Sequence, residues 1–167
     1  MSGQIYIYHH LGLGDHFHCN GVVRFLLKNK YKNKEVNLFA KKKYFEMVKF
    51  MYRDLDNLKI IAITNNEKDE PKEINSFVKS NDKIERIGFD YFLMNKDKGK
   101  TIDILFYEQF KINYTDRFKL TYWKRDTLQE NKLYDQLVKN KNFVFVHDDP
   151  SRNFVIKDES ISKEYQI

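Results

Sequence analysis

Residues 5–27, with the sequence IYIYHHLGLGDHFHCNGVVRFLL, contain the pattern that decides the fold. The stretch opens with a β-rich run at Ile5–Tyr8, which Gly12 and Gly14 close. Apolar side chains then recur at the spacing of one helix face, at Cys19, Val22, Val23, Leu26 and Leu27. A strand that turns tightly into an amphipathic helix is the opening unit of an α/β fold. We expect Gly21 to allow close contact between this helix and the sheet.

Apolar runs and helical spacing alternate along the rest of the chain. Residues 83–87 read as a short strand, a helix is expected to have Pro71 in its first turn, and another covers residues 101–110. A further helix is expected to be capped by Asp126 or Thr127. The more apolar runs predict neighbouring parallel strands at residues 4–8, 35–40, 58–63 and 143–147. The expected fold class is therefore α/β, a Rossmann-like three-layer sandwich with a mostly parallel sheet.

Composition excludes several classes of protein. The length of 167 residues suits one main domain. Cys19 is the only cysteine, which excludes a disulfide framework and a cysteine-rich zinc module. No apolar run approaches the ~18 residues of a membrane span, and the first residues lack a signal pattern. We therefore expect a cytoplasmic protein with no integral membrane segment.

Positive charge is concentrated near the N-terminus. The net charge is +6, and residues 1–60 hold 11 Lys and Arg against 5 Asp and Glu, whereas residues 61–167 hold 19 of each kind. Lysines dominate the excess, at positions 28, 30, 32, 34, 41, 42 and 43. Such a patch would attract phosphate groups, an anionic membrane surface or nucleic acid. A solvated surface with no dedicated partner is the other interpretation.

Polar residues gather where the predicted strands end. Ligands of open parallel sheets bind at the carboxyl ends of the strands. The residues that follow the first predicted strand are His9, His10, Gly12, Gly14, Asp15 and His16. Those that follow the last predicted strand are His147, Asp148, Asp149, Ser151 and Arg152. We expect histidines and carboxylates from both groups to converge at one edge of the sheet.

The glycine turn admits more than one interpretation. Its two glycines would let the backbone approach an anion at the helix start. A dinucleotide site would need a third glycine where Phe17 stands and an acid near Lys41, and a phosphate-binding Walker loop would need a Gly-Lys-Ser/Thr sequence. A tight turn with no chemistry is the remaining alternative.

Asp15 is the candidate catalytic residue. A carboxylate at a helix start is stabilised by the dipole, which makes a helix cap the plain interpretation. The same carboxylate could instead accept a hydroxyl proton as a general base. The spacings of His9 with His10 and of His16 with His18 suit no bidentate metal pair, so neither a metal nor another cofactor is expected.

Residues 5–27, with HHLGLGDHFHCNGVVRFLL after the first strand, resemble the opening of GT-B glycosyltransferases, particularly the heptosyltransferase-like group. Residues 143–153, FVFVHDDPSRN, look like the segment in which such proteins cross from the first Rossmann-like domain into the second. The resemblance implies an acceptor-side domain at residues 1–150. Residues 151–167 would then be the start of a second domain or a tail.

The same resemblance implies partners and roles. Asp15 would be the base toward an acceptor hydroxyl, in a reaction with a glycan or lipid-linked acceptor and a nucleotide-sugar donor. The acceptor would contact His9, His10, Gly12, Gly14, His16 and Asn20. The donor or the second domain would face His147, Asp148, Asp149, Ser151 and Arg152. Because no donor domain follows, we expect the chain to need a separate donor domain or a homodimer for turnover.

The alternative function is a non-catalytic module that binds an anionic ligand, a nucleic acid or a glycan, through the basic first third. Most aromatic residues fall on predicted core faces and do not alternate with the lysines. Nucleic acid is therefore not the expected partner.

Overall fold

The computed structural model describes residues 3–95, 99–138, 143, 144, 146, 147, 149 and 153–157. The chain divides into two compact units, Met1–Lys124 and Arg125–Ile167. Residues 150–152, around the predicted domain boundary, lie outside the described residues.

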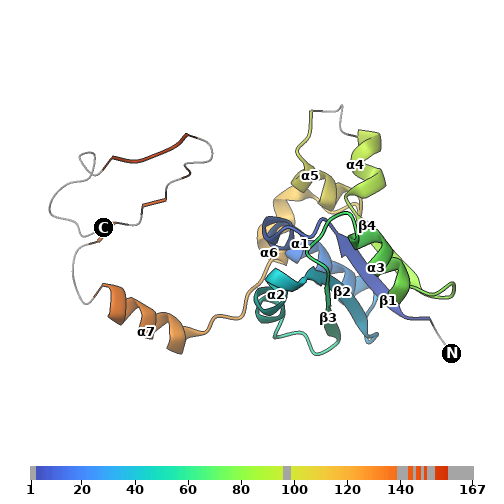
Figure 1. Ribbon diagram of the computed structural model, residues 1–167, viewed down its shortest axis with the longest axis horizontal. Coiled ribbons are helices and arrows are strands. Elements are labelled where there is room, and N and C mark those ends of the chain that lie inside the picture. The colour runs from blue at the N-terminus through green and yellow to red at the C-terminus, as the bar shows by residue number, and fades with distance from the viewer. Residues whose placement is uncertain are drawn as a thin grey trace. The chain divides into compact units, whose positions relative to one another are not determined.

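The first unit is built on a four-stranded sheet of order β3-β2-β1-β4 (Figure 1). Its strands are β1 (Ile5–His9), β2 (Val36–Lys41), β3 (Leu58–Ile63) and β4 (Lys83–Ile87). All three neighbouring pairs are parallel. The predicted α/β fold with a Rossmann-like parallel sheet is confirmed.

Helices connect the strands and follow the sheet. The connections contain α1 (Leu13–Phe25), which continues into a π-helical turn (Leu26–Lys30), α2 (Phe45–Met51) and α3 (Glu70–Phe77). After β4 come α4 (Phe89–Asn95), α5 (Ile102–Glu108) and α6 (Arg117–Leu120). Pro71 lies in the first turn of α3, and α5 lies within the residues 101–110 that the sequence predicts as a helix.

Two apolar cores make the unit a three-layer structure. On one face of the sheet, Ile5 and Ile7 of β1 pack with buried residues of α1, α2 and α5. On the other face, the alternate β1 residues Tyr6 and Tyr8 pack with Ile74 of α3. Figure 1 shows α2 and α3 on opposite sides of the strands. Burial of each large apolar side chain stabilises the unit by about 1.5–3 kcal/mol, so both faces contribute.

Gly21 allows close packing, but between helices. A Cβ on Gly21 would lie 2.6 Å from the Tyr107 hydroxyl oxygen of α5 and 3.1 Å from the Leu120 Cβ of α6. The Tyr107 hydroxyl donates a hydrogen bond of 3.0 Å to the His18 carbonyl. The expectation that Gly21 faces the sheet is therefore wrong, because α5 and α6 cover this side of α1.

The stretch 143–147 does not extend the sheet in the part of the chain that the structure describes. Residues 143, 144, 146 and 147 belong to none of the four strands, and Phe143 and Val144 are 42% and 36% exposed. The place beside β1 is taken by β4, which pairs with it along Ile5–His9. The prediction of a neighbouring strand at residues 143–147 is wrong for these described residues.

The second unit contains α7 (Thr127–Leu137). The Asp126 side chain caps this helix by accepting a 3.1 Å hydrogen bond from the Gln129 backbone N–H, as expected. Further along, Asp149 and Phe154 form an antiparallel bridge. In the described residues of both units, no helix has the length and apolarity that a membrane crossing requires.

Candidate functional site

A pocket of about 330 Å³ lies at the carboxyl edge of the sheet. The crossover from β1 passes over one face and the crossover from β3 over the other, so the strand order changes direction between β1 and β4. Such a switch point is where open α/β sheets bind ligands. Residues from four segments line the pocket, among them His10, Gly12, Asp15, Lys41, Glu70 and Phe89.

The turn after β1 fixes the position of Asp15. Gly12 is the N-cap of α1, and its carbonyl accepts the first helical hydrogen bond, 3.2 Å from the His16 nitrogen. Asp15 is the third residue of the helix, and its carboxylate accepts a hydrogen bond from the Gly12 backbone N–H. This is the acidic half of a capping box. A Cβ on Gly12 would lie 2.7 Å from Oδ2 of Asp15, so this close approach depends on glycine.

The environment of Asp15 raises the pKa of its carboxyl group. Partial burial of this half-buried side chain is the largest influence and raises the pKa. His10, the Gly12 N–H, His18 and Lys41 act in the opposite direction without cancelling it. A carboxylate with a raised pKa is a stronger proton acceptor than an ordinary surface aspartate.

Lys41 places a buried positive charge at the end of β2. Its ammonium group lies 2.8 Å from Glu67 and 3.7 Å from Glu70. Burial acts to lower the pKa of Lys41, but the two carboxylates outweigh it and the pKa is raised, so the amine remains charged. Glu70 also accepts a 2.7 Å hydrogen bond from the Tyr8 hydroxyl. The wall of the pocket is thus a connected set of charged and polar groups.

His10 and Phe89 form the aromatic side of the pocket. Their rings are stacked, with centroids 4.5 Å apart and planes 14° apart. Nε2 of His10 is buried and has no hydrogen-bond partner among the described residues. Tyr8 and Arg86 also contact Phe89, at 4.4 Å between ring centroids and 4.9 Å from guanidinium to ring. In the described part of the chain, Nε2 of His10 is therefore a buried, unpaired ring nitrogen beside the stacked Phe89 ring.

His9 and His16 lie in the core, away from the lining of the pocket. Both side chains are fully buried, and their rings meet edge to face with centroids 4.3 Å apart. Burial lowers the pKa of His9 to about 4 and that of His16 to about 2. Both imidazoles are therefore neutral at physiological pH.

Of the other residues predicted to bind the acceptor, some line the pocket and some lie outside it. His10 and Gly12 line the pocket with Asp15. Asn20 is buried, and its Oδ1 accepts hydrogen bonds from Arg24 and from the Tyr122 backbone. Gly14 is exposed in the first turn of α1, outside the lining.

The residues predicted to face the donor belong to the second unit. His147 is exposed and Asp149 pairs with Phe154 through two backbone hydrogen bonds of 2.8 and 3.0 Å. Asp148, Ser151 and Arg152 lie outside the described residues. That these five residues face a donor remains a prediction.

Sequence reasoning missed Glu67, Glu70 and Phe89. Phe89 lies two residues after the end of β4 and could have been found by extending the strand-end rule to residues 83–87. Glu70 begins α3, where an acidic residue is ordinary and gives no signal of a pocket. Among the described residues, no three histidine, cysteine or acidic side chains gather as a metal site would require.

Comparisons with protein-family models, with curated proteins and with solved structures found no match to this chain.

Proposed function

We propose that the carboxyl-edge pocket binds the acceptor sugar of a glycosyl transfer and that Asp15 is the general base. The observation that carries the proposal is the position of Asp15: a half-buried carboxylate with a raised pKa, lining a pocket at the switch point of a parallel sheet. The similarity of residues 5–27 to the opening of GT-B glycosyltransferases supports the same assignment.

The groups around Asp15 suit a polyhydroxylated ligand. Glu67 and Glu70 can accept hydrogen bonds from sugar hydroxyls, and the Lys41 ammonium can donate them. Phe89 offers an apolar surface for the C–H face of a sugar ring. A mixture of a few polar groups with aromatic surface is typical of small-molecule sites.

The reaction is a single displacement at the anomeric carbon of the donor. Asp15 takes the proton of the acceptor hydroxyl, and the hydroxyl oxygen forms the new C–O bond. The bond from the anomeric carbon to the nucleoside diphosphate breaks, and the diphosphate leaves with the electron pair. No change of oxidation state occurs, and the anomeric configuration is inverted. The nucleotide-sugar donor, and the separate domain or second copy that would hold it, belong to this proposal.

Binding is tested with the full 167-residue chain. Simple pyranoses and nucleotide-sugars are titrated while backbone amide chemical shifts are followed. We expect one class of pyranose to shift the amides of Leu11, Gly12, Asp15 and Phe89 saturably, with a millimolar Kd. Shifts confined to other surfaces, or no saturable shift with any sugar, would overturn the acceptor assignment.

Catalysis is tested by Asp15→Asn in the chain supplemented with a donor-binding domain. Asparagine keeps the shape but cannot take a proton, so we expect the transfer rate to fall on the order of 10²–10⁴-fold while sugar binding changes little. Asp56→Asn, at an exposed position outside the pocket, is the matched control and should retain the parent rate. Equal rates for the two variants would leave Asp15 as a structural residue.

A further inference from the structure

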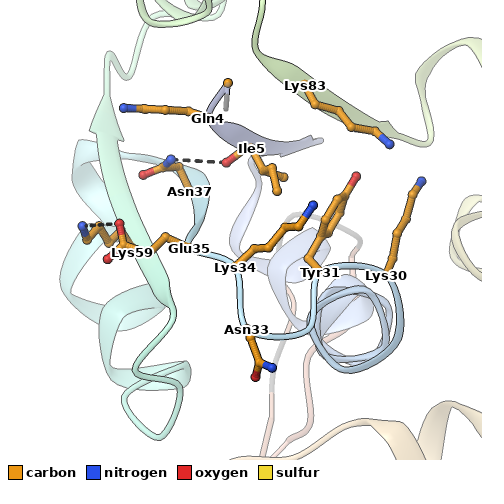
Figure 2. A pocket seen from close by; sticks show the side chains of 11 residues that line it. Gln4, Ile5, Lys30, Tyr31, Asn33, Lys34, Glu35, Asn37, Lys59 and Lys83 are labelled. Atoms are coloured by element: carbon orange, nitrogen blue, oxygen red, sulfur yellow. Dashed lines mark hydrogen bonds and ion pairs between the residues drawn. The ribbon is translucent and has the colours of Figure 1, made fainter. Parts of the chain in front are cut away.

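A second pocket, of about 680 Å³, lies at the amino edge of the sheet, opposite the Asp15 pocket (Figure 2). Parallel pairing brings the starts of all strands to this edge, and Lys59 and Lys83 lie at the starts of β3 and β4. The connection from α1 to β2 adds Lys30 and Lys34. Four lysines from three segments thus line one concave surface.

A tight turn positions the lysines of that connection. Asn33 adopts a left-handed conformation with φ 62°, which asparagine tolerates better than most residues. The Lys34 backbone N–H donates a 3.0 Å hydrogen bond to the Tyr31 carbonyl and closes the turn. Tyr31 is only 3% exposed and forms a fixed wall. Figure 2 shows its side chain between those of Lys30 and Lys34, with Lys83 reaching toward it from β4.

Nearby carboxylates only partly balance the positive charge. Glu85 lies 2.8 Å from the Lys30 ammonium and 3.4 Å from that of Lys83, and it also accepts a hydrogen bond from the Tyr31 hydroxyl. Burial acts to raise the pKa of Glu85, but these partners outweigh it and lower the pKa, so the carboxylate stays ionised. On the other side of the pocket, Lys59 pairs with Glu35 at 2.9 Å.

Lys34 is the unpaired lysine among the described residues that line the pocket. Within the described residues its ammonium group forms no ion pair, whereas the other three lysines of the pocket do. The two carboxylates, Glu35 and Glu85, leave the four lysines with a net charge of +2. A concave surface with a net positive charge concentrates anionic ligands.

We infer that this amino-edge pocket binds a small anion that bears several phosphate groups. Lysine side chains from three segments line the concavity, with Lys30, Lys34 and Lys83 near Tyr31 and Lys59 across from them, so a bound ligand can meet more than one ammonium group. The volume lies within the roughly 300–1,000 Å³ typical of small-molecule sites. The inference is independent of the proposed function, because Asp15 lies at the opposite edge.

The lining disfavours a single-stranded nucleic acid. Tyr31 is the only aromatic residue among the described residues that line the pocket, and its ring is buried. Lys30 and Lys83 also flank this ring, at 5.7 and 5.5 Å from its centroid. The pocket therefore offers no open stacking platform for a base.

The probe is inorganic triphosphate, titrated into the full chain by calorimetry and by amide chemical shifts. We expect one saturable site whose amide shifts centre on Tyr31, Lys34 and Lys83, with an affinity that weakens as salt is raised. A nucleoside triphosphate is the second arm. Equal affinity for triphosphate and for the nucleoside triphosphate would show that the pocket recognises the phosphates alone. Tighter binding of the nucleoside triphosphate would show that the pocket also contacts the nucleoside.

The test variant is Lys34→Gln with Lys83→Gln, which leaves the Lys30–Glu85 pair in place. We expect triphosphate to bind at least tenfold more weakly. The matched control is Lys68→Gln with Lys72→Gln, which removes the same charge from exposed positions outside the pocket and should stay within about twofold of the parent. Thermal melting checks that both variants are folded.

Three results would overturn the inference. The first is no saturable binding of triphosphate, and the second is the same loss of affinity in the test and control variants. The third is a mixed-sequence oligonucleotide that binds through Lys34 and Lys83 while triphosphate neither binds nor competes. That last result would assign the lysines to a nucleic-acid surface.

Discussion

The position of the Asp15 carboxylate depends on Gly12, the N-cap of the same helix. A methyl group added at Gly12 therefore tests this interaction. In Gly12→Ala the added Cβ would lie 2.7 Å from Oδ2, so the carboxylate must move away from the Gly12 N–H. Because that N–H lowers the pKa of Asp15, its loss should raise the pKa further. A lost hydrogen bond of about 1 kcal/mol should also lower the Tm by roughly 2–4 °C.

Carboxyl NMR titration and thermal melting measure both effects of Gly12→Ala. Gly14→Ala is the matched control, because no atom lies within 4 Å of the added Cβ there. In Gly14→Ala the pKa of Asp15 should equal the parent value. The Tm should be unchanged or slightly higher, because alanine has a higher helix propensity than glycine. An unchanged Asp15 pKa in Gly12→Ala would contradict the capping interaction.

The buried histidine pair predicts a loss of stability in acid. Folding lowers the pKa of His9 to about 4 and that of His16 to about 2, whereas unfolded histidine titrates near about 6.5. Below that pH the unfolded chain therefore binds more protons than the folded one. The free energy of unfolding is therefore unaffected by these two groups above about pH 6.5. It decreases as the pH falls below that value, down to about pH 4 for His9 and about pH 2 for His16. The loss at pH ~4.5 should be on the order of a few kcal/mol.

Urea unfolding at pH ~7.5 and ~4.5 measures this loss. In His16→Leu, one of the two titrating groups is replaced by an apolar side chain that suits a site with no hydrogen-bond partners for the ring. We expect the difference in unfolding free energy between the two pH values to shrink by about half. A difference equal to that of the parent chain would assign acid sensitivity to other groups.

At the scale of elements, the contact of α1 with α5 and α6 is set by the missing side chain of Gly21. A methyl group would lie 2.6 Å from the Tyr107 hydroxyl, so Gly21→Ala should destabilise the protein by about 1–3 kcal/mol through overpacking. Tyr107→Phe removes that oxygen, and in the double variant part of the loss should be recovered. The recovery is incomplete because Leu120 Cβ also lies within 3.1 Å. Strictly additive losses in a double-mutant cycle would contradict direct contact.

The local pattern of the sequence predicted the helices and strands well, but it predicted less well which strands pair. The spacing of apolar residues and glycines within residues 5–27 is sufficient to predict β1, the turn after it and α1. This one unit places His10, Gly12 and Asp15 in the lining of the same pocket. The apolar run at 143–147 is stronger than the alternating KIERI of β4, yet β4 pairs with β1. An edge strand needs only one close neighbour and tolerates charge, so hydrophobicity alone does not identify it. Phe89 could still have been found from residues 83–87, whereas Glu70 joins the candidate site only once the position of α3 is known.

At the scale of the whole molecule, the two units predict that the first one folds alone. The four-stranded sheet, both apolar cores and both pockets consist of residues up to Lys124. A chain ending at Lys124 should therefore unfold cooperatively, with a Tm within a few degrees of the full chain, and bind triphosphate with the same affinity. Circular dichroism, urea unfolding and calorimetry provide the comparison. A fragment with secondary structure but no cooperative transition would show that residues 125–167 complete the core, because loss of fixed packing with retained helices is the mark of an incomplete fold.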